Sequence, residues 1–410
     1  MDLLLQQSSL NKDQSLINVT GSKSESNRLL LLQALYPNIK LENISKSDDS
    51  DAMQMALLSK DEIIDIHHAG TAMRFLTAFF AVQENKEVIL TGSSRMKERP
   101  IKILVEALKQ LGAVITYEEN EGFPPIRIKG KKITNNKVTL KADVSSQYIS
   151  ALLLIAPKLK NGLELTLEGE ITSIPYIRMT LGLLNEIGVE TTFENNVIKV
   201  NPQFVIHNSQ LIIESDWSSA SYFYSIVALS EIGTQISLSS YKQSSLQGDS
   251  ALVEIYKGFG VETVFNDNES ITIAKINFKN QKALVFNLQS SPDIAQTIAV
   301  TCFGLRMACH LTGLHTLKIK ETDRLEALKT ELSKLGANVS VTNDSLTIEQ
   351  SNNLNVGVSI STYQDHRMAM AFAPLALKTS LVINEAEVVS KSFPTFWKDL
   401  KSIGFQISDI

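Results

Sequence analysis

The stretch Ala107–Tyr117, ALKQLGAVITY, decides the fold, because the chain repeats its pattern. An amphipathic segment is followed by a glycine and then by β-branched residues. This order predicts a helix, a glycine in the left-handed conformation that ends it, and a strand. Successive glycines are 76, 72, 76 and 68 residues apart. The other copies are LLNEIGVETTF (183–193), IYKGFGVETVF (255–265), ELSKLGANVSV (331–341), DLKSIGFQIS (399–408) and a degenerate sixth, AMQMALLSKDEIIDI, from Ala52.

A second helix recurs in phase with the first, and its first turn is rich in small polar residues. Such residues cap the free backbone N–H groups at a helix start, where the helix dipole leaves partial positive charge. An ordinary N-cap explains any one of these starts, but six of them, with cations nearby, favour anion-binding positions. The six starts lie at Ser22, Gly70, Ser145, Ser218, Ser291 and Gln364.

The length of the chain fits two domains. It has 410 residues, 43% of them hydrophobic, which is enough for roughly two to three average cores. Six repeats divide into two domains of three. The change from LIIES to DWSSASYF near Asp216 is the best boundary, because three helix starts precede it and three follow it. We expect one domain over 20–215 and a second over 1–19 and 216–410.

Composition and local patterns exclude several classes of protein. With 39 basic and 44 acidic residues the net charge is -5, so the totals do not suggest a nucleic-acid surface. The N-terminal LLL lacks the flanks of a signal peptide, and the apolar runs are too short to cross a bilayer. We expect a cytoplasmic monomer that binds neither nucleic acid nor membrane.

The sequence does not predict a metal site. Cys302 and Cys309 are seven residues apart on one helical pattern and are expected in the core. His67 and His68 are adjacent, so their side chains diverge on any regular element. We therefore expect no metal and no cofactor.

Positive charge collects near the helix starts. Lys23, Ser24 and Arg28 occupy the first turns of their helix, and Arg74 repeats the arrangement in the next one. A cation there opposes the helix dipole and costs roughly a few tenths of a kcal/mol unless an anion lies beside it. The segment RMKERP (95–100) adds three cations and is either a solvated loop or part of the same site.

The segment KETDR (320–324) is the strongest local signal. Either Thr322 or Asp323 can cap the helix that follows, but capping explains neither Lys320 nor Arg324. DHR (365–367) places carboxylate, imidazole and guanidinium groups at another helix start. Such mixtures suit proton transfer beside a phosphate, because arginine clamps the oxygens while a neighbouring acid or base is tuned by the same charges.

These motifs resemble those of the 5-enolpyruvylshikimate-3-phosphate synthase family. The matching segments occur in family order over nearly the whole chain: GSKSESNR from Gly21, AGTAMR from Ala69, RMKERP from Arg95, SSQYISALL from Ser145, SIPYI around Tyr176, SSASYF from Ser218, QGD from Gln247, PDIAQTIA from Pro292, KETDRL from Lys320, QDHRMAM from Gln364 and KSFPTFW from Lys391.

The resemblance implies transfer of the enolpyruvyl group of phosphoenolpyruvate to the 5-hydroxyl of shikimate 3-phosphate, with release of phosphate, in chorismate and aromatic amino acid biosynthesis. It also implies an α/β fold of the two-domain inside-out barrel type. In this fold each domain holds three of six βαβαββ repeats, and the active site lies in the interdomain cleft.

By motif match the resemblance also assigns site residues. Shikimate 3-phosphate would be bound by Lys23, Ser24, Arg28, Ser145, Ser146, Gln147, Ser173, Tyr176, Asp293, Thr316 and Lys320. Phosphoenolpyruvate would be bound by Lys23, Gly70, Arg99, Gln147, Arg324, Arg367 and Lys391. The catalytic group would comprise Lys23, Asp293, Lys320, Glu321, His366 and Lys391.

Within that group the resemblance implies that Asp293 is the base for the 5-hydroxyl proton, with Lys320 beside it. Glu321, together with Lys391 or His366, is the candidate acid that protonates the methylene carbon. Addition gives a tetrahedral ketal phosphate and elimination of phosphate restores the enol ether, with no covalent adduct of the enzyme.

Four positions depart from the family pattern: His68, Phe75, Trp217 and Thr316, the last in place of an asparagine that helps to hold shikimate 3-phosphate. These departures concern affinity, pH optimum and the response to glyphosate rather than the type of reaction. Because Gly70 is retained, the glyphosate-sensitive form of the family is the closer match.

Two alternatives stay open from the sequence. One is the sister enolpyruvyl transferase that acts on UDP-N-acetylglucosamine, but KETDR, GSKSESNR and DHR follow the shikimate pattern. The other is a non-catalytic repeat scaffold, which predicts charges scattered over outer surfaces instead of gathered at helix starts.

Overall fold

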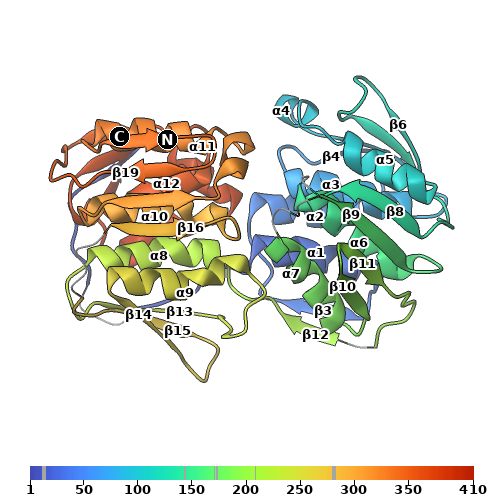
Figure 1. Cartoon of the computed structure of the whole chain (residues 1–410), viewed down its shortest axis with the longest axis horizontal. Coiled ribbons are helices and arrows are strands. Elements are labelled where there is room, and N and C mark those ends of the chain that lie inside the picture. Colours follow the sequence, from blue (N-terminus) through green and yellow to red (C-terminus); the bar gives the residue numbers. More distant parts are fainter. Residues whose placement is uncertain (12–14, 143–144, 170, 172–173, 208, 279–282) are drawn as a thin grey trace. The chain divides into compact units, whose positions relative to one another are not determined.

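The computed structural model describes residues 1–410 except 12–14, 143–144, 170, 172–173, 208 and 279–282. Its internal contacts divide the chain into two compact units. We call residues 21–213 the middle unit, and residues 1–20 with 214–410 the split unit (Figure 1). Each unit has its own cluster of buried apolar side chains and is described by itself.

Three buried helices form the centre of the middle unit. Two of them are apolar on nearly every side, which is typical of a helix covered on all sides, and the third is mostly buried although its first six residues are polar. They are α1 (Lys23–Leu35), α3 (Gly70–Ala81) and α6 (Ser146–Ile155), which pack against one another. Further helices lie outside them: α2 (Asp48–Leu58), α4 (Ser94–Lys97), α5 (Lys102–Leu111), the 3-10 turn η1 (Ala156–Lys158) and α7 (Ile174–Glu186).

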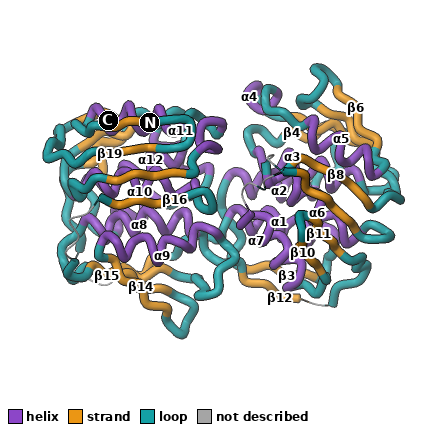
Figure 2. Tube along the Cα trace, in the orientation of Figure 1, coloured by secondary structure: helices purple, strands orange, loops and turns teal. Residues whose placement is uncertain are grey.

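Three sheets surround those helices (Figure 2). Two have four strands, in the orders β4-β5-β7-β6 and β10-β11-β9-β8, and one pairs β12 with β3. The strands are β3 (Ile39–Glu42), β4 (Ile63–Asp65), β5 (Glu87–Thr91), β6 (Val114–Tyr117), β7 (Ile126–Lys129), β8 (Lys137–Lys141), β9 (Leu163–Glu168), β10 (Thr191–Glu194), β11 (Val197–Val200) and β12 (Ser209–Ile212).

The split unit repeats this plan around three other helices. They are α8 (Trp217–Leu229), α10 (Ala295–Gly304) and α12 (His366–Phe372), which pack side by side (Figure 1). The remaining helices and 3-10 turns are η2 (Gly248–Ala251), α9 (Leu252–Ile255), η3 (Tyr256–Phe259), η4 (Pro292–Ile294), η5 (His315–Ile319), α11 (Arg324–Lys334), η6 (Ala373–Leu377), η7 (Ala386–Lys391) and α13 (Phe396–Ser402).

The three sheets of the split unit have the orders β14-β15-β13-β2, β16-β17-β19-β18 and β20-β21-β1-β22. Their strands are β1 (Leu3–Leu5), β2 (Ser15–Ile17), β13 (Gln235–Leu238), β14 (Val261–Phe265), β15 (Ile271–Lys275), β16 (Leu284–Asn287), β17 (Cys309–Thr312), β18 (Val339–Val341), β19 (Leu346–Ile348), β20 (Val358–Ile360), β21 (Leu381–Ile383) and β22 (Ile407–Asp409).

All five four-stranded sheets share one pattern, with one parallel pair followed by two antiparallel pairs. In the last sheet, β1 fills the place between β21 and β22, with Leu4 opposite both Val382 and Ser408. The N-terminal strand therefore completes the repeat that the C-terminal segment begins.

The predicted glycine conformation is confirmed in all five copies. Gly112, Gly188, Gly260, Gly336 and Gly404 have φ angles of 104°, 88°, 70°, 102° and 116°. The helix expected before Gly260 is instead a four-residue α9 between two 3-10 turns. Gly258 interrupts that segment, and glycine is a poor helix former.

The degenerate sixth copy differs from the other five. Its helix α2 leads to β4, which pairs in parallel with β5, whereas the strand after each glycine pairs in an antiparallel direction. The segment from Ala52 is therefore a degenerate copy, as the sequence indicated: the helix is kept, but the strand pairs in the other direction. In the remaining sheet the described residues show β12 and β3 alone, which correspond to the parallel pair of the module.

Both cysteines are buried in the core of the split unit, as predicted. The single helical pattern expected for them is wrong, because Cys302 lies in α10 and Cys309 begins β17. Among the described residues, no helix has both the length and the apolar character that a membrane crossing requires.

Candidate active site

Arg324 lies at the start of α11 and joins three carboxylates in the split unit. Its side chain is buried, with an exposed fraction of 2%. Its Nε donates to Asp365 at 2.6 Å, and its two Nη atoms donate to Asp293 at 2.9 Å and to Glu321 at 2.8 Å. Burial lowers the pKa of the guanidinium, but the three carboxylates outweigh burial and raise it above its usual value.

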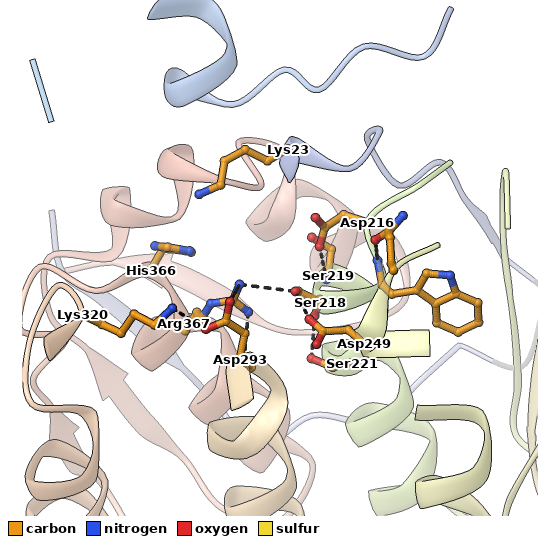
Figure 3. Close-up of polar contacts among 12 residues, drawn as sticks. Lys23, Asp216, Ser218, Ser219, Ser221, Asp249, Asp293, Lys320, His366 and Arg367 are labelled. Carbon is orange, nitrogen blue, oxygen red and sulfur yellow. Dashed lines mark hydrogen bonds and ion pairs between the residues drawn. The ribbon is translucent and has the colours of Figure 1, made fainter. Parts of the chain in front are cut away.

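Asp293, in the 3-10 turn before α10, faces two further cations. Lys320 Nζ lies 3.5 Å from Asp293 Oδ1, and Arg367 Nη2 lies 3.4 Å from Asp293 Oδ2 (Figure 3). Arg367 also donates to the backbone carbonyl of Asp293 at 3.0 Å. The motifs PDIAQ, KETDR and DHR, far apart in the sequence, therefore meet at one carboxylate.

The start of α12 is held by a tight turn. Tyr363 and Gln364 both have φ of 55°, the left-handed region that non-glycine residues rarely occupy. The Tyr363 hydroxyl donates to buried Glu331 at 2.6 Å, and Lys391 Nζ donates to the Gln364 carbonyl at 2.9 Å. The carboxylate of Asp365 then accepts from the Arg367 backbone N–H at 2.9 Å and caps the helix.

This turn places two of the predicted catalytic residues. His366 is buried, with Nδ1 3.9 Å from Asp365 Oδ1, and Lys391 is anchored to the turn itself. The predicted cap at Asp323 is confirmed, because its carboxylate accepts from the N–H groups of Leu325 and Glu326 at 3.2 Å.

In the middle unit, Arg28 is buried and binds neutral oxygens. Its donors reach the hydroxyls of Thr180 and Ser150 and the carbonyls of Ser24 and Tyr176. Burial lowers its pKa to about 10. Lys23, at the start of the same helix, lies 3.5 Å from Asp49.

The starts of α3 and α6 come together in the middle unit. Gln147 Nε2 donates to Thr71 Oγ1 at 3.1 Å. Arg99 packs against Gly70 so closely that a Cβ added to this glycine would lie 2.5 Å from Arg99 Nη1. The glycine is therefore needed to seat a guanidinium beside the first turn of α3.

Arg74 lies close to this pair. It donates to the carbonyls of Gly70 at 3.0 Å and Pro100 at 3.2 Å. Burial, and then the positive charge of Arg99, lower the pKa of Arg74 to about 10. Two guanidinium groups thus repel each other beside a helix start, and a bound anion would relieve that repulsion.

Part of the RMKERP segment is ordinary surface. Arg95 pairs with Glu98 and Lys97 with Glu119, each at 2.8 Å and largely exposed. The solvated-loop interpretation is confirmed for the contact with solvent but is wrong about the loop, because Arg95 and Lys97 lie in the short helix α4. Arg99 turns toward Gly70.

The N-cap interpretation holds for four of the six helix starts, where a side chain of Ser22, Ser145, Asp216 or Asp365 accepts from the first turn. The starts of α3 and of η4 with α10 have no such bond among the described residues. A polar first turn therefore predicted the positions of helix starts, and anion binding at these starts stays a prediction.

Other predicted residues are placed less tightly. Ser146 is buried in the first turn of α6, and Ser145 accepts from the Gln147 N–H at 3.3 Å. Within the described residues, the buried hydroxyl of Thr316 has no hydrogen-bond partner. Ser173 lies outside the described residues.

Sequence reasoning gave no role to Asp49 or Asp249, and it named Ser218 only as a helix start. Asp49 pairs with Lys23, and Asp249 accepts from Ser218, which in turn binds Arg367. Ser218 and Asp249 do lie in recognised motifs, SSASYF and QGD, so their position was visible but their partners were not.

Comparison with known proteins matches the chain to a family. The family model described as EPSP synthase (3-phosphoshikimate 1-carboxyvinyltransferase) matches residues 54–400. A 3-phosphoshikimate 1-carboxyvinyltransferase of Bacteroides fragilis (strain YCH46) is 46% identical over 400 residues, covering 95% of each chain. One from Sulfurovum sp. (strain NBC37-1) is 36% identical over 94% of this chain and 96% of its own.

Solved structures support the fold. EPSP synthase from Acinetobacter baumannii superposes with a TM-score of 0.82 at 20% identity, with all of both chains covered. The enolpyruvyl transferase NikO from Streptomyces tendae gives a TM-score of 0.75 at 12% identity over 99% of this chain and 98% of its own. The expected α/β fold class is thereby confirmed, and the chain belongs to the EPSP synthase family.

Proposed function

We propose that this chain transfers the carboxyvinyl group of phosphoenolpyruvate to the 5-hydroxyl of shikimate 3-phosphate, with Asp293 and Glu321 as its proton-transfer carboxylates. The observation that carries the assignment is the bridge through Arg324, whose two Nη atoms hold both carboxylates at 2.8–2.9 Å. One buried guanidinium thus fixes the spacing of the base and the candidate acid.

In the first step Asp293 accepts the proton of the 5-hydroxyl while that oxygen attacks C2 of phosphoenolpyruvate. Lys320, 3.5 Å from Asp293, stabilises the negative charge that develops on the attacking oxygen. A proton delivered to the methylene carbon by Glu321, Lys391 or His366 completes the addition and gives a tetrahedral ketal phosphate. Loss of a methyl proton and of phosphate then yields the enol ether.

Each unit supplies part of the proposed substrate contacts. In the middle unit, Lys23, Ser24, Arg28, Ser145, Ser146, Gln147, Ser173 and Tyr176 are assigned to shikimate 3-phosphate. In the split unit, Asp293, Thr316 and Lys320 are assigned to the same substrate. Phosphoenolpyruvate is assigned to Lys23, Gly70, Arg99 and Gln147, and to Arg324, Arg367 and Lys391.

The crowding of cations supports an anionic ligand in the middle unit. Arg99 lowers the pKa of neighbouring Arg74, and Arg99 itself lies against the first turn of α3. The partial positive charge of that turn adds to theirs. We further propose a cytoplasmic, monomeric enzyme.

The test is release of phosphate by the purified chain in the presence of shikimate 3-phosphate and phosphoenolpyruvate. UDP-N-acetylglucosamine replaces the acceptor as the control and should give no release. Asp293→Asn should lower kcat by at least roughly a hundred-fold, while Asp267→Asn, an exposed change in the β14–β15 turn, should not. Phosphate release with the nucleotide sugar, or full turnover in Asp293→Asn, would refute the proposal.

A further inference from the structure

A serine hydroxyl links a buried carboxyl group to Arg367 in the split unit. Asp249 lies in η2 and is 7% exposed. The Ser218 hydroxyl, in the first turn of α8, donates to Asp249 Oδ2 and accepts from Arg367 Nη2 at 3.3 Å (Figure 3). Three elements that are distant in the sequence, η2, α8 and α12, thus share one chain of hydrogen bonds.

Arg367 therefore lies between two carboxyl groups. Asp293 contacts it directly, at 3.4 Å from Nη2, and Asp249 contacts it through Ser218. A third carboxylate, Asp216, caps α8 and adds negative charge near Asp249. An anion that binds Arg367 must therefore compete with negative charge already present there.

Asp249 can lose its charge near neutral pH. Burial, and then the negative charge of Asp293, raise its pKa to about 7, although Arg367 and the bond from Ser218 act in the opposite direction. A further negative charge at Arg367 would raise this pKa again, by the same effect that Asp293 has.

We propose that Asp249 is a positioning residue that acts on Arg367 through Ser218 and takes up a proton from the solvent when the phosphoenolpyruvate anion binds. The proton forms an O–H bond on the Asp249 carboxyl, which then donates to Ser218. The negative charge of Asp249 then no longer competes with the ligand, so the positive charge of Arg367 attracts the ligand more strongly. This inference rests on the proposed assignment of Arg367 to phosphoenolpyruvate.

The test is the pH dependence of KM for phosphoenolpyruvate at saturating shikimate 3-phosphate. If the protonated form binds, KM for the wild type should rise roughly ten-fold from pH 6 to pH 8, beyond the change due to the titration of the ligand itself. The asparagine in Asp249→Asn has nearly the same shape as the aspartate but stays neutral. KM of this variant should therefore change with pH only as far as the titration of phosphoenolpyruvate changes it. At pH 8 its KM should fall below that of the wild type, and at pH 6 the two should agree.

Ser218→Ala tests the link, and Asp267→Asn is the matched control for the loss of an aspartate charge. In Ser218→Ala, the rise of KM for phosphoenolpyruvate from pH 6 to pH 8, beyond the change due to the ligand, should be less than half of that in the wild type. In Asp267→Asn this rise should be the same as in the wild type. KM for shikimate 3-phosphate should follow the same pH curve in every variant. If Asp249→Asn does not fold, the comparison of Ser218→Ala with the wild type still measures how much of the pH dependence of KM requires the link to Arg367.

Two results would overturn the inference. KM for phosphoenolpyruvate could rise with pH equally in Asp249→Asn and the wild type, or Ser218→Ala could keep the full wild-type rise. These are distinct from failure of the proposed function. If the wild type releases no phosphate at any pH, the function is wrong. If it turns over with the same pH profile as Asp249→Asn, only the role of Asp249 is wrong.

Discussion

The two units bury arginines in opposite ways. In the middle unit, Arg28 and Arg74 donate to hydroxyl and carbonyl oxygens, and burial lowers the pKa of each to about 10. In the split unit, carboxylates surround Arg324 and Arg367 and raise their pKa despite the same burial. Both units place these arginines near helix starts, yet their electrostatics differ.

The difference suggests a division of labour. Neutral partners leave the charge of a guanidinium available to an anion, and the cost of burying it is recovered when the anion binds. Carboxylate partners cancel the charge, but they supply groups that accept and donate protons. We therefore infer that the middle unit contributes mainly affinity for phosphorylated ligands, and that the split unit contributes the acid–base chemistry.

Arg324→Met gives the largest expected effect. It leaves three carboxylates in one cluster without their common cation, and removing one partner of a buried ion pair costs about 3–5 kcal/mol of unfolding free energy. Urea denaturation measures the loss, and phosphate release should be undetectable. The control is Arg127→Met, because Arg127 also contacts three carboxylates but at the surface. Equal losses in the two variants would contradict the contrast between buried and exposed networks.

Arg28→Met should be less costly to the fold than Arg324→Met. The oxygens that Arg28 leaves are neutral, and Ser150 and Thr180 already lie 2.9 Å apart, so they can bond to each other. We expect a loss of about 1–2 kcal/mol of unfolding free energy. KM for shikimate 3-phosphate should rise at least roughly ten-fold, the equivalent of 1.4 kcal/mol. A variant that unfolds as easily as Arg324→Met would break the comparison.

Gly70→Ala sharpens the comparison inside the middle unit. The added methyl would lie 2.5 Å from Arg99 Nη1, and because that guanidinium ends a flexible side chain, it should move while the fold stays. KM for phosphoenolpyruvate should rise roughly ten-fold, or about 1.4 kcal/mol. Gly258→Ala, where an added Cβ finds its nearest neighbour at 3.6 Å, is the control. An unchanged KM would show that phosphoenolpyruvate binding does not depend on the present position of the Arg99 guanidinium.

Much of the fold could be predicted because the module repeats. The glycines after Leu111, Ile187, Leu335 and Ile403 predicted both the end of each helix and the strand beyond it. The glycine after Phe259 predicted the strand, but a 3-10 turn precedes it instead of a regular helix. A further exception was the segment from Ala52, where a helix followed by a strand looked like another copy. The direction of pairing depends on partner strands elsewhere in the sequence. The residues of β4 alone therefore could not distinguish this parallel edge strand from the antiparallel edge strands that follow the glycines.

For the site, short motifs located residues but not their partners. Asp323 was identified as a cap because its bonds are local, within three residues. The bonds from Arg324 to Asp293 and Asp365 span 31 and 41 residues, and the bond from Ser218 to Asp249 also spans 31. Such contacts depend on how α8, α10 and α12 pack, which no local pattern records.

Backbone strain gives the smallest expected effect and a second contrast between the units. In the described part of the middle unit, four of the five non-glycine residues with positive φ are asparagines, which tolerate that region, and His67 is the fifth. The six such residues in the described part of the split unit include Tyr363 and Gln364 but no asparagine. The split unit therefore keeps costlier backbone conformations, two of them directly before Asp365 and His366.

Gln364→Gly should relieve part of that strain. The left-handed conformation costs a non-glycine residue about 1–2 kcal/mol, and added freedom of the unfolded chain offsets part of the gain, so unfolding free energy should rise by roughly 0.5–1 kcal/mol. Asn196→Gly in the middle unit should gain less in the same urea titration. The bond from Lys391 to the Gln364 carbonyl survives the change, but a looser turn orients His366 and Arg367 less firmly, so kcat should fall about two- to five-fold. If Gln364→Gly is both more stable and fully active, strain in this turn serves neither binding nor catalysis, and the contrast between the units lies in their charges alone.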